Sequence, residues 1–367
     1  MIFAPPFLIL SATHDYRTKR RVDLHFIADE LSTIGETMFV GTHSSPVSRW
    51  RGRDQRYELR NAPAGGHGGA VESYLWHSLV HPVNVRPRRL AAWNRLASEI
   101  YARTMPEAVR LMIDRAHTIV VESGSALALI PEIARRNPGA RIIYSASDTL
   151  KTIGMAQFYD RALEVAAPAI AYARLPSARM AADHACIARH RVIPHGLSQS
   201  FFADTPDPYA GRTAAVSVGG MLFDPHVFTV AAAAFPHIDF YVIGSGYAGE
   251  DRANLHWIPE LSFEDTIPYI RHARLGIAPY RSAMLADYLV DTSMKLMQFD
   301  AAGLPAVCPG FAQGDKANRF AYQVGDDVSI IVAIEKALSF PRQQPSQPRT
   351  WRRVVEEMLA PMDDFAL

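Results

Sequence analysis

The sequence predicts an α/β protein of two Rossmann-like, doubly wound domains that face a cleft. Short apolar runs alternate with helical patterns along most of the 367 residues, an order typical of parallel βαβ units. The length also exceeds the roughly 150 residues of one domain. The stretch ADTPDPYAG (203–211) has the composition of a linker. We therefore expect a first domain at 1–205, a second at 206–345, and a segment 346–367 whose helix packs back on the first.

The first domain begins with the apolar run FLILSA (7–12), which we expect to be a buried strand. Apolar residues then recur at helical spacing from Leu24 to Ile34, and Gly35 closes this helix. Between residues 42 and 95 the alternation is interrupted by a basic, aromatic insert. Further strands are predicted at 37–41, 118–123 and 141–146, and a further helix at 149–166.

The second domain repeats the same alternation after the linker. Strands are predicted at 214–219, 238–246, 274–280 and 304–308, and a last helix from about Trp351 to Leu359. In doubly wound sheets, ligands bind at the carboxyl ends of the strands. Functional residues are therefore expected directly after the predicted strands.

Composition excludes several classes of protein. Hydrophobic residues make up 49% of the chain and charged residues 20%, as in ordinary globular proteins. The two cysteines form no CxxC or His/Cys cluster, which argues against a disulfide framework or a zinc site and favours a reducing compartment. No apolar run reaches the 18–20 residues of a membrane span, and the basic residues follow the apolar start, the reverse of a signal peptide.

The charge is unevenly distributed along the chain. Residues 1–200 carry 25 Lys and Arg against 17 Asp and Glu, whereas residues 201–367 carry 13 against 20. A basic first half indicates an anionic partner, and because no nucleic-acid recognition motif accompanies it, we favour an anionic membrane surface. The candidate membrane-contacting residues are basic or aromatic: Arg17, Arg20, Arg21, Arg49, Trp50, Arg51, Arg88, Arg89 and Trp93.

A candidate phosphate site lies in the second domain. In DTSMKLMQFDAAGLPAV (291–307), Ser293 and Lys295 stand at the start of a short predicted helix. A helix N-terminus attracts anions, and the hydroxyl and the ammonium add to that attraction. Gly219-Gly220 and the GSG at 244–246 end two of the strands. The alternative is an N-cap serine beside a solvent-directed lysine. The chain has no GxxxxGK[ST], and its first βαβ unit lacks a GxGxxG followed by a ribose-binding acid, which argues against a P-loop enzyme or a dehydrogenase.

Two carboxylates follow strands of the first domain. Asp148, after the run RIIYSA, is our candidate general base. Glu122 ends the preceding predicted strand and is a candidate for orienting a partner or binding acceptor hydroxyls. The alternative role of Asp148 is the N-cap of the helix predicted at 149–166, and that of Glu122 is a cap for a helix starting near Ser123. His195, in IPHG, is a further candidate for binding or orienting an acceptor.

Long ordered motifs of this chain resemble glycosyltransferase family 70, the β-glucuronosyltransferases of xanthan-type exopolysaccharide synthesis. The motifs are SATHDYRTKRR, VVESGSALAL, YSASDTLKT, VGGMLFDP, FYVIGSG and DTSMKLMQFDAAGLPAVCP, and the likeness runs from about residue 7 to 340. The resemblance implies the two-domain GT-B fold, UDP-glucuronate as donor, inversion at the anomeric carbon and no metal or other cofactor. It also implies a polyprenyl-diphosphate-linked oligosaccharide acceptor and a peripheral location on the cytoplasmic face of the inner membrane.

The same resemblance assigns roles to individual residues. It implies that Asp148 is the catalytic base. It implies UDP-binding positions at Gly220, Met221, Glu260, Leu261, Tyr280, Leu289, Met294, Lys295 and Gln298, to which the residue pattern adds Ser293. Ser145 and the stretch Pro259–Phe263 depart from the family pattern. Two alternatives therefore remain open: a GT-B transferase with another UDP-sugar, and a catalytically silent sugar-nucleotide-binding or lipid-binding protein. A panel of donors discriminates among the three.

Overall fold

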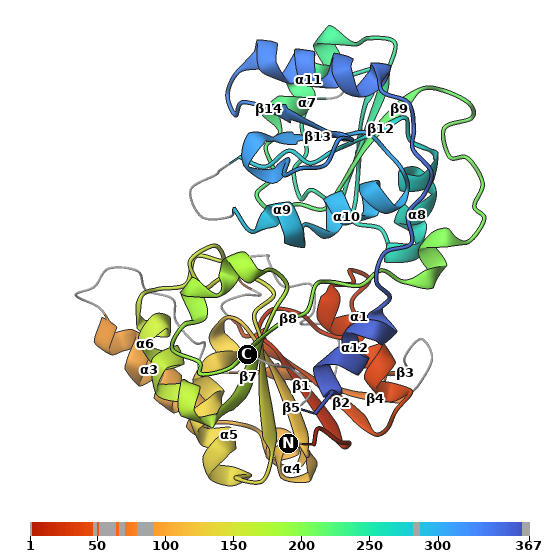
Figure 1. Ribbon diagram of the computed structural model, residues 1–367. Helices are drawn as coiled ribbons and strands as arrows, with labels where there is room; N and C mark the ends of the chain where they lie inside the picture. The colour runs from red at the N-terminus through yellow and green to blue at the C-terminus, as the bar shows by residue number, and fades with distance from the viewer. Residues whose placement is uncertain are drawn as a thin grey trace. The chain divides into compact units, whose positions relative to one another are not determined.

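The computed structural model describes residues 2–46, 50, 64–65, 70–78, 91–250, 252–281 and 287–361, and the chain folds into two compact units (Figure 1). The first unit is made of Met1–Pro194 and Trp351–Leu367, and the second of His195–Thr350. The expected boundary was residue 205. The segment before the linker belongs to the second unit because Leu197 N donates to Arg349 O at 2.9 Å.

The first unit is built on an eight-stranded sheet in the order β3-β4-β2-β1-β5-β6-β7-β8. All neighbouring strands pair in parallel except β3 and β4. The central strands are fully buried runs, as predicted for a sheet covered on both faces. Their bounds are β1 Phe7–Ser11, β2 Thr37–Ser44, β3 Ala64–Gly65, β4 Ala70–His77, β5 Thr118–Glu122, β6 Arg141–Ser145, β7 Ile170–Leu175 and β8 His190–Val192.

Helices cover both faces of this sheet (Figure 1). The helix predicted at 24–34 is α1, and the predicted C-terminal helix is α12, which packs against α1 through stacked rings of Phe26 and Trp351, 5.4 Å apart. Arg191 on β8 donates to the carbonyls of Glu357 and Ala360 at the end of α12, at 3.0 and 2.9 Å. The bounds are α1 Asp23–Ser32, α3 Ala91–Arg103, α4 Glu107–Arg115, α5 Ile130–Arg136, α6 Phe158–Ala166 and α12 Trp351–Leu359.

The helix predicted at 149–166 is wrong over its first half, because α6 begins only at Phe158. Residues 150–154 form a turn in which Met155 N donates to Leu150 O at 2.8 Å. Gly154 has φ of +71°, a left-handed conformation that ends helical geometry. The loop after β6 therefore leads into an isolated turn, and the helix does not begin until Phe158.

The second unit has a six-stranded parallel sheet in the order β11-β10-β9-β12-β13-β14. The four predicted strands of this unit are confirmed as β9, β10, β12 and β13, and the pattern missed β11 and β14. The bounds are β9 Ala214–Val218, β10 Asp239–Ile243, β11 Leu255–Ile258, β12 Leu275–Ile277, β13 Ala306–Pro309 and β14 Arg319–Tyr322.

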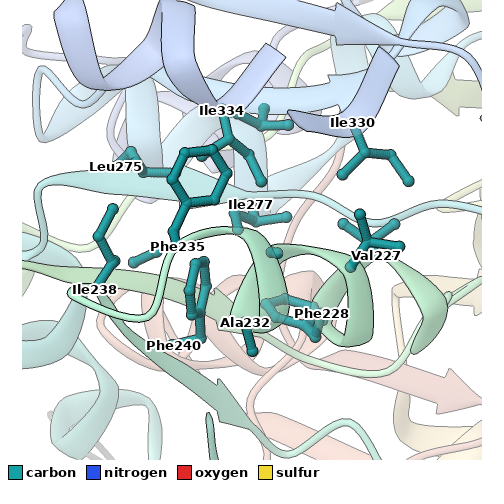
Figure 2. Close-up of a cluster of buried hydrophobic side chains, with 14 of the residues drawn as sticks. Val227, Phe228, Ala232, Phe235, Ile238, Phe240, Leu275, Ile277, Ile330 and Ile334 are labelled. Carbon is teal, nitrogen blue, oxygen red and sulfur yellow. The ribbon is translucent and has the colours of Figure 1, made fainter. Parts of the chain in front are cut away.

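The core of the second unit lies between one face of this sheet and two helices. α7 (His226–Ala234) and α11 (Asp327–Ser339) bury Val227, Phe228, Ile330 and Ile334 against strand residues that include Phe240 and Ile277 (Figure 2). On the opposite face, α10 (Met294–Ala301) places Phe299 against Gly276, where a Cβ would lie 2.4 Å from the ring. α8 (Phe263–His272) and α9 (Leu289–Thr292) complete the unit.

Within the described ranges, no helix combines the length and the apolar character needed to cross a membrane.

Candidate active site

The carboxyl ends of β1, β5 and β6 lie side by side in the first unit, because these strands are parallel neighbours in register. Glu122, the last residue of β5, is paired with Ser145, the last residue of β6. Asp148 follows three residues later in the loop after β6. The structure thus brings the two predicted carboxylates to one edge of the sheet, as expected for a ligand site of a doubly wound fold.

Glu122 is not a helix cap. Its carboxylate reaches across to the loop after β1, where Oε2 accepts hydrogen bonds from Ser11 Oγ at 2.7 Å and from Ala12 N at 2.6 Å. The side chain is buried, and this burial, with the nearby charge of Asp23, raises the pKa of Glu122 to about 7. Glu122 therefore holds the loop that follows β1 and titrates near neutral pH.

Asp148 does not begin a helix either, so the capping alternative for this residue is wrong. It is half-buried, and its backbone N–H points to Ser123 Oγ at 3.5 Å, at the end of the neighbouring strand. Asp148 thus lies at the carboxyl edge of the sheet, where a carboxylate can take a proton from a bound hydroxyl.

Sequence reasoning missed two charged residues beneath this loop. Arg174 on β7 and Asp23 at the start of α1 form a buried ion pair, with Nη1 and Oδ2 3.0 Å apart. Burial lowers the pKa of Arg174, yet a guanidinium beside a carboxylate keeps its proton. The sequence did contain a signal for this pair, an arginine inside the apolar run IAYARL. A strand buried on both faces rarely contains an unpaired charge, so such an arginine predicts a buried acidic partner.

His195 is the first residue of the second unit and is buried. It follows β8 by three residues, in the segment that leads toward the linker. Its predicted role in acceptor binding stays a prediction.

The carboxyl edge of the second sheet gathers most of the predicted donor-binding residues. Lys295, in the first turn of α10, is turned inward: Nζ lies 3.2 Å from Ser217 Oγ and 3.4 Å from Gly219 O, at the end of β9. The same ammonium lies 5.6 Å from the centre of the Tyr280 ring. The solvent-directed alternative for Lys295 is therefore wrong. Ser217, a buried polar residue in the apolar run AAVSV, was not predicted.

Ser293 is the N-cap of α10, since its Oγ accepts a hydrogen bond from Leu296 N at 3.1 Å. The same oxygen shares a short hydrogen bond with the Tyr280 hydroxyl. The capping alternative is thus confirmed for Ser293, and the cap fixes the N-terminus of α10 beside Tyr280. Lys295 lies in the first turn of α10, so its charge and the positive end of the helix macrodipole are at the same end of the helix.

Two glycine turns, after β9 and after β10, form part of the backbone of this edge. A Cβ on Gly220 would lie 2.4 Å from Ser245 O, so the turn after β9 packs directly on the turn after β10. Gly244 has φ of +64°, a left-handed conformation that favours glycine. Met221 and Glu260 are exposed in this region. A side chain at Gly220 would be overcrowded and one at Gly244 strained, so both positions favour glycine and let the backbone approach a ligand.

The remaining predicted donor residues occupy the same half of the unit. Leu289, in α9, and Gln298, in α10, are buried, whereas Met294 and Leu261 are half-buried. Met294 and Gln298 are four residues apart and so share one side of α10. Arg319 on β14 supports this region: Nη1 donates to Val290 O at 2.9 Å and Nη2 pairs with Asp300 at 2.7 Å.

The predicted membrane-contacting residues divide into groups. Arg17 is paired with Asp15 at 3.0 Å, and Arg21 forms a close ion pair with Asp29, so both charges are compensated locally. Arg20, Trp50 and Trp93 are exposed. Arg49, Arg51, Arg88 and Arg89 lie outside the described residues. Membrane contact by these residues stays a prediction.

Among the residues that the structure describes, no group of three or more His, Cys, Asp or Glu side chains is placed to hold a metal ion.

Comparison with known proteins gives the family. A model described as "Glucuronosyltransferase GumK, N-terminal domain" matches residues 9–176. A Xanthomonas campestris pv. campestris protein, "UDP-glucuronate:glycolipid 2-beta-glucuronosyltransferase", is 40% identical over 362 residues, which cover 97% of this chain and 90% of that protein. This relationship spans both units of the chain.

Solved structures give the fold. An α,α-trehalose-phosphate synthase (UDP-forming) from Burkholderia xenovorans is similar with a TM-score of 0.61 at 11% identity, covering 96% of both chains. An E. coli structure described as trehalose-6-phosphate bound with UDP-2-fluoro glucose is similar with a TM-score of 0.59 at 13% identity, covering 96% of this chain and 95% of that one. At such identities the likeness shows the fold alone, which is the GT-B fold of glycosyltransferases. On the 40% identity across both units, the chain belongs to the GumK family of glucuronosyltransferases.

Proposed function

We propose that this protein transfers glucuronate from UDP-glucuronate to a glycolipid. The observation that carries the proposal is the inward-turned Lys295 at the N-terminus of α10, within a chain 40% identical to a UDP-glucuronate:glycolipid glucuronosyltransferase. A fixed ammonium and a helix N-terminus stabilise the diphosphate that becomes the leaving group. Membership of the family by itself supports a glycosyltransferase. The position of Lys295 at the N-terminus of α10 adds support for UDP as the leaving group.

On the donor side, the diphosphate approaches the turns at Gly220 and Gly244 and the first turn of α10. Lys295 then exchanges its hydrogen bond to Ser217 for one to phosphate oxygen, and Tyr280 presents its ring and hydroxyl at the same place. Met221, Glu260, Leu261 and Gln298 are proposed to contact the nucleoside and its ribose. Charge developing on the leaving UDP is met by Lys295 and by the positive end of α10.

On the acceptor side, we assign the general base to Asp148. Its carboxylate takes the proton of an acceptor hydroxyl, and the hydroxyl oxygen attacks C1 of glucuronate on the face opposite UDP. The bond between C1 and the UDP oxygen breaks, and UDP leaves with the electron pair. One displacement of this kind inverts the configuration at C1. Glu122 supports the adjacent loop and is the second carboxylate at this edge.

The proposed transfer needs no metal. A positive helix end and Lys295 supply the positive charge at the diphosphate that a divalent cation supplies in other transferases. Turnover is expected to be unchanged after dialysis against EDTA and unchanged by added Mg²⁺ or Mn²⁺. A loss of activity in EDTA that Mn²⁺ restores would contradict this part of the proposal.

The proposed acceptor is an oligosaccharide linked to a polyprenyl diphosphate, presented on the cytoplasmic face of the inner membrane. Such an acceptor stays in the bilayer, so the enzyme must reach the surface. The exposed Arg20, Trp50 and Trp93 of the first unit are suited to a peripheral contact with anionic headgroups. Each basic residue close to such a surface contributes about 1 kcal/mol.

The decisive experiment incubates the purified protein with extracted lipid-linked oligosaccharides and a panel of UDP-sugars. Release of UDP and β-linked glucuronate in the product, with UDP-glucuronate as the preferred donor, is the expected result. Preference for another UDP-sugar would leave a GT-B transferase of different specificity. Binding of UDP without release from any donor would instead indicate a catalytically silent binding protein.

A further inference from the structure

The loop that carries Asp148 is held by hydrogen bonds to residues far from it in the sequence. Ser147 Oγ donates to Asp23 Oδ2 at 2.7 Å, and Asp23 lies 124 positions earlier, at the start of α1. Ala146 N donates to Arg174 O at 3.0 Å, and Ser123 N donates to Ser145 O at 3.0 Å. Each of the three residues preceding Asp148 is therefore tied to a different element.

Arg174 is the centre of this arrangement. Its side chain is fully buried, and Nη1 donates to Asp23 Oδ2 at 3.0 Å and approaches Ser145 Oγ at 3.4 Å. Asp23 Oδ2 thus accepts from both Arg174 and Ser147, while Oδ1 accepts from Leu24 N at 2.9 Å. These hydrogen bonds fix the orientation of the Asp23 carboxylate. The carboxylate in turn holds the Ser147 hydroxyl in one direction.

A buried ion pair of this kind is a weak source of stability, because desolvation of the two charges offsets their attraction. An apolar pair of similar volume would fill the same space without the cost of burying two charges. What an apolar pair would lack is a hydrogen-bond acceptor for Ser147. Packing alone therefore does not explain the hydrogen bond between Asp23 and Ser147, the residue next to the proposed base.

We infer that Ser147, Asp23 and Arg174 are positioning residues that set the orientation of Asp148 for proton transfer. This inference rests on the proposed function, in which Asp148 is the general base. Asp23 itself is not suited to be the base, because both of its oxygens accept hydrogen bonds within the protein and its side chain is buried. A base displaced by about 1 Å loses up to 10²-fold in rate, so small shifts of this loop matter.

The test uses Ser147, which is half-buried, because removing one hydroxyl there is compatible with folding. S147A is compared with S147T, which keeps the hydroxyl, and with S32A. Ser32 is the matched control: its Oγ also donates a 2.7 Å hydrogen bond, to Asp29 O, at the other end of α1. Each variant is measured for kcat, for KM of UDP-glucuronate, for UDP affinity and for melting temperature.

The expected result is a fall in kcat of about tenfold for S147A, with KM of the donor, UDP affinity and melting temperature unchanged. S147T recovers the parent kcat within about twofold, and S32A resembles the parent. A parent-like kcat for S147A, or an equal loss in S147A and S147T, would overturn the inference.

Crystal structures of the parent and S147A separate this inference from the proposed function. The Asp148 carboxylate is expected to move or to become disordered in S147A and to keep its place in S147T. An unmoved carboxylate in S147A refutes the positioning role whatever the activity. A parent enzyme that transfers no sugar from any donor refutes the proposed function, while the displacement of Asp148 would still be measured.

Discussion

The ammonium of Lys295 lies 3.2 Å from the hydroxyl of Ser217, a residue 78 positions earlier at the buried end of β9. The contact directs a charged side chain toward the carboxyl edge of the sheet, where the glycine turns after β9 and β10 meet. Lys295 is therefore already oriented toward the site in which we place the diphosphate. Pre-orientation lowers the entropy cost of binding, which is why the lysine is the first residue to test.

Lys295→Ala is expected to weaken UDP binding at least tenfold and to slow transfer. A charge-assisted hydrogen bond to a bound anion contributes roughly 1.5–3 kcal/mol, and the substitution removes it. Isothermal titration calorimetry with UDP measures the change. Lys336→Ala is the matched control, because Lys336 is an exposed lysine of α11 in the same unit. Equal UDP affinity in the parent and both variants would exclude Lys295 from the donor site.

Asp148→Asn is expected to slow transfer by about 10²–10⁴-fold while UDP affinity stays constant, because an amide cannot accept the acceptor's proton. The melting temperature should stay within a degree or two, since Asp148 caps no helix. Single-turnover kinetics with saturating donor measures the chemical step. A variant that transfers glucuronate at nearly the parent rate would move the role of base to Glu122.

Glu122→Gln is expected to remove a pH dependence of stability. The pKa of Glu122 is raised from its ordinary value of 4.5 to about 7 in the folded protein, mainly by burial. Its contribution to folding is therefore fully present below pH 4.5 and is lost as the pH rises through 7. The parent loses this contribution between pH 4.5 and pH 8, and the variant does not. Over that range the free energy of unfolding of the variant should therefore rise by about 3 kcal/mol relative to that of the parent.

Gln offers an oxygen to Ser11 Oγ and Ala12 N, so both hydrogen bonds of Glu122 are available to the variant. Urea unfolding at several pH values measures the difference. Parallel curves for parent and variant across this range would show that Glu122 keeps an ordinary pKa.

Gly220→Ala is expected to weaken UDP binding and to destabilise the second unit. The new Cβ would lie 2.4 Å from Ser245 O, which is backbone and can yield only if the whole turn shifts. Overpacking of this kind costs typically 1–3 kcal/mol. Gly310→Ala is the control, because a Cβ there has no neighbour within 4 Å. UDP affinity is measured by calorimetry and the free energy of unfolding by denaturant titration. Equal values for the two variants would contradict the close packing of these turns.

Membrane attachment is expected to be peripheral and sensitive to salt. The protein should sediment with vesicles containing anionic phospholipid at 50 mM salt and should be released by 1 M salt, since screening removes the attraction. Neutral phosphatidylcholine vesicles are the control and should bind little protein. Binding that persists in 1 M salt would mean that apolar side chains, with exposed Trp50 and Trp93 the first to examine, insert into the bilayer.

Two α/β units, and the strands that carry the site, follow from the residue pattern alone. Buried strands such as Phe7–Ser11 and Thr118–Glu122 are continuous apolar runs, because a parallel sheet covered on both faces excludes polar residues over most of its length. A polar residue directly after such a run must lie at the carboxyl edge of the sheet. Asp148 and Glu122 were located by this rule.

The contacts that hold those residues in place depend on the three-dimensional fold. Asp23 and Arg174, 151 positions apart, meet where the first residue of α1 comes to the carboxyl end of β7, and no local pattern relates them. The same applies to Ser11 with Glu122 and to Lys295 with Ser217, separated by 111 and 78 positions. The turn at residues 150–154 was predicted as helix, because local periodicity does not register a left-handed glycine that the fold requires. Hydrophobic periodicity reports burial, whereas the direction of a buried polar side chain depends on which distant partner satisfies its hydrogen bonds.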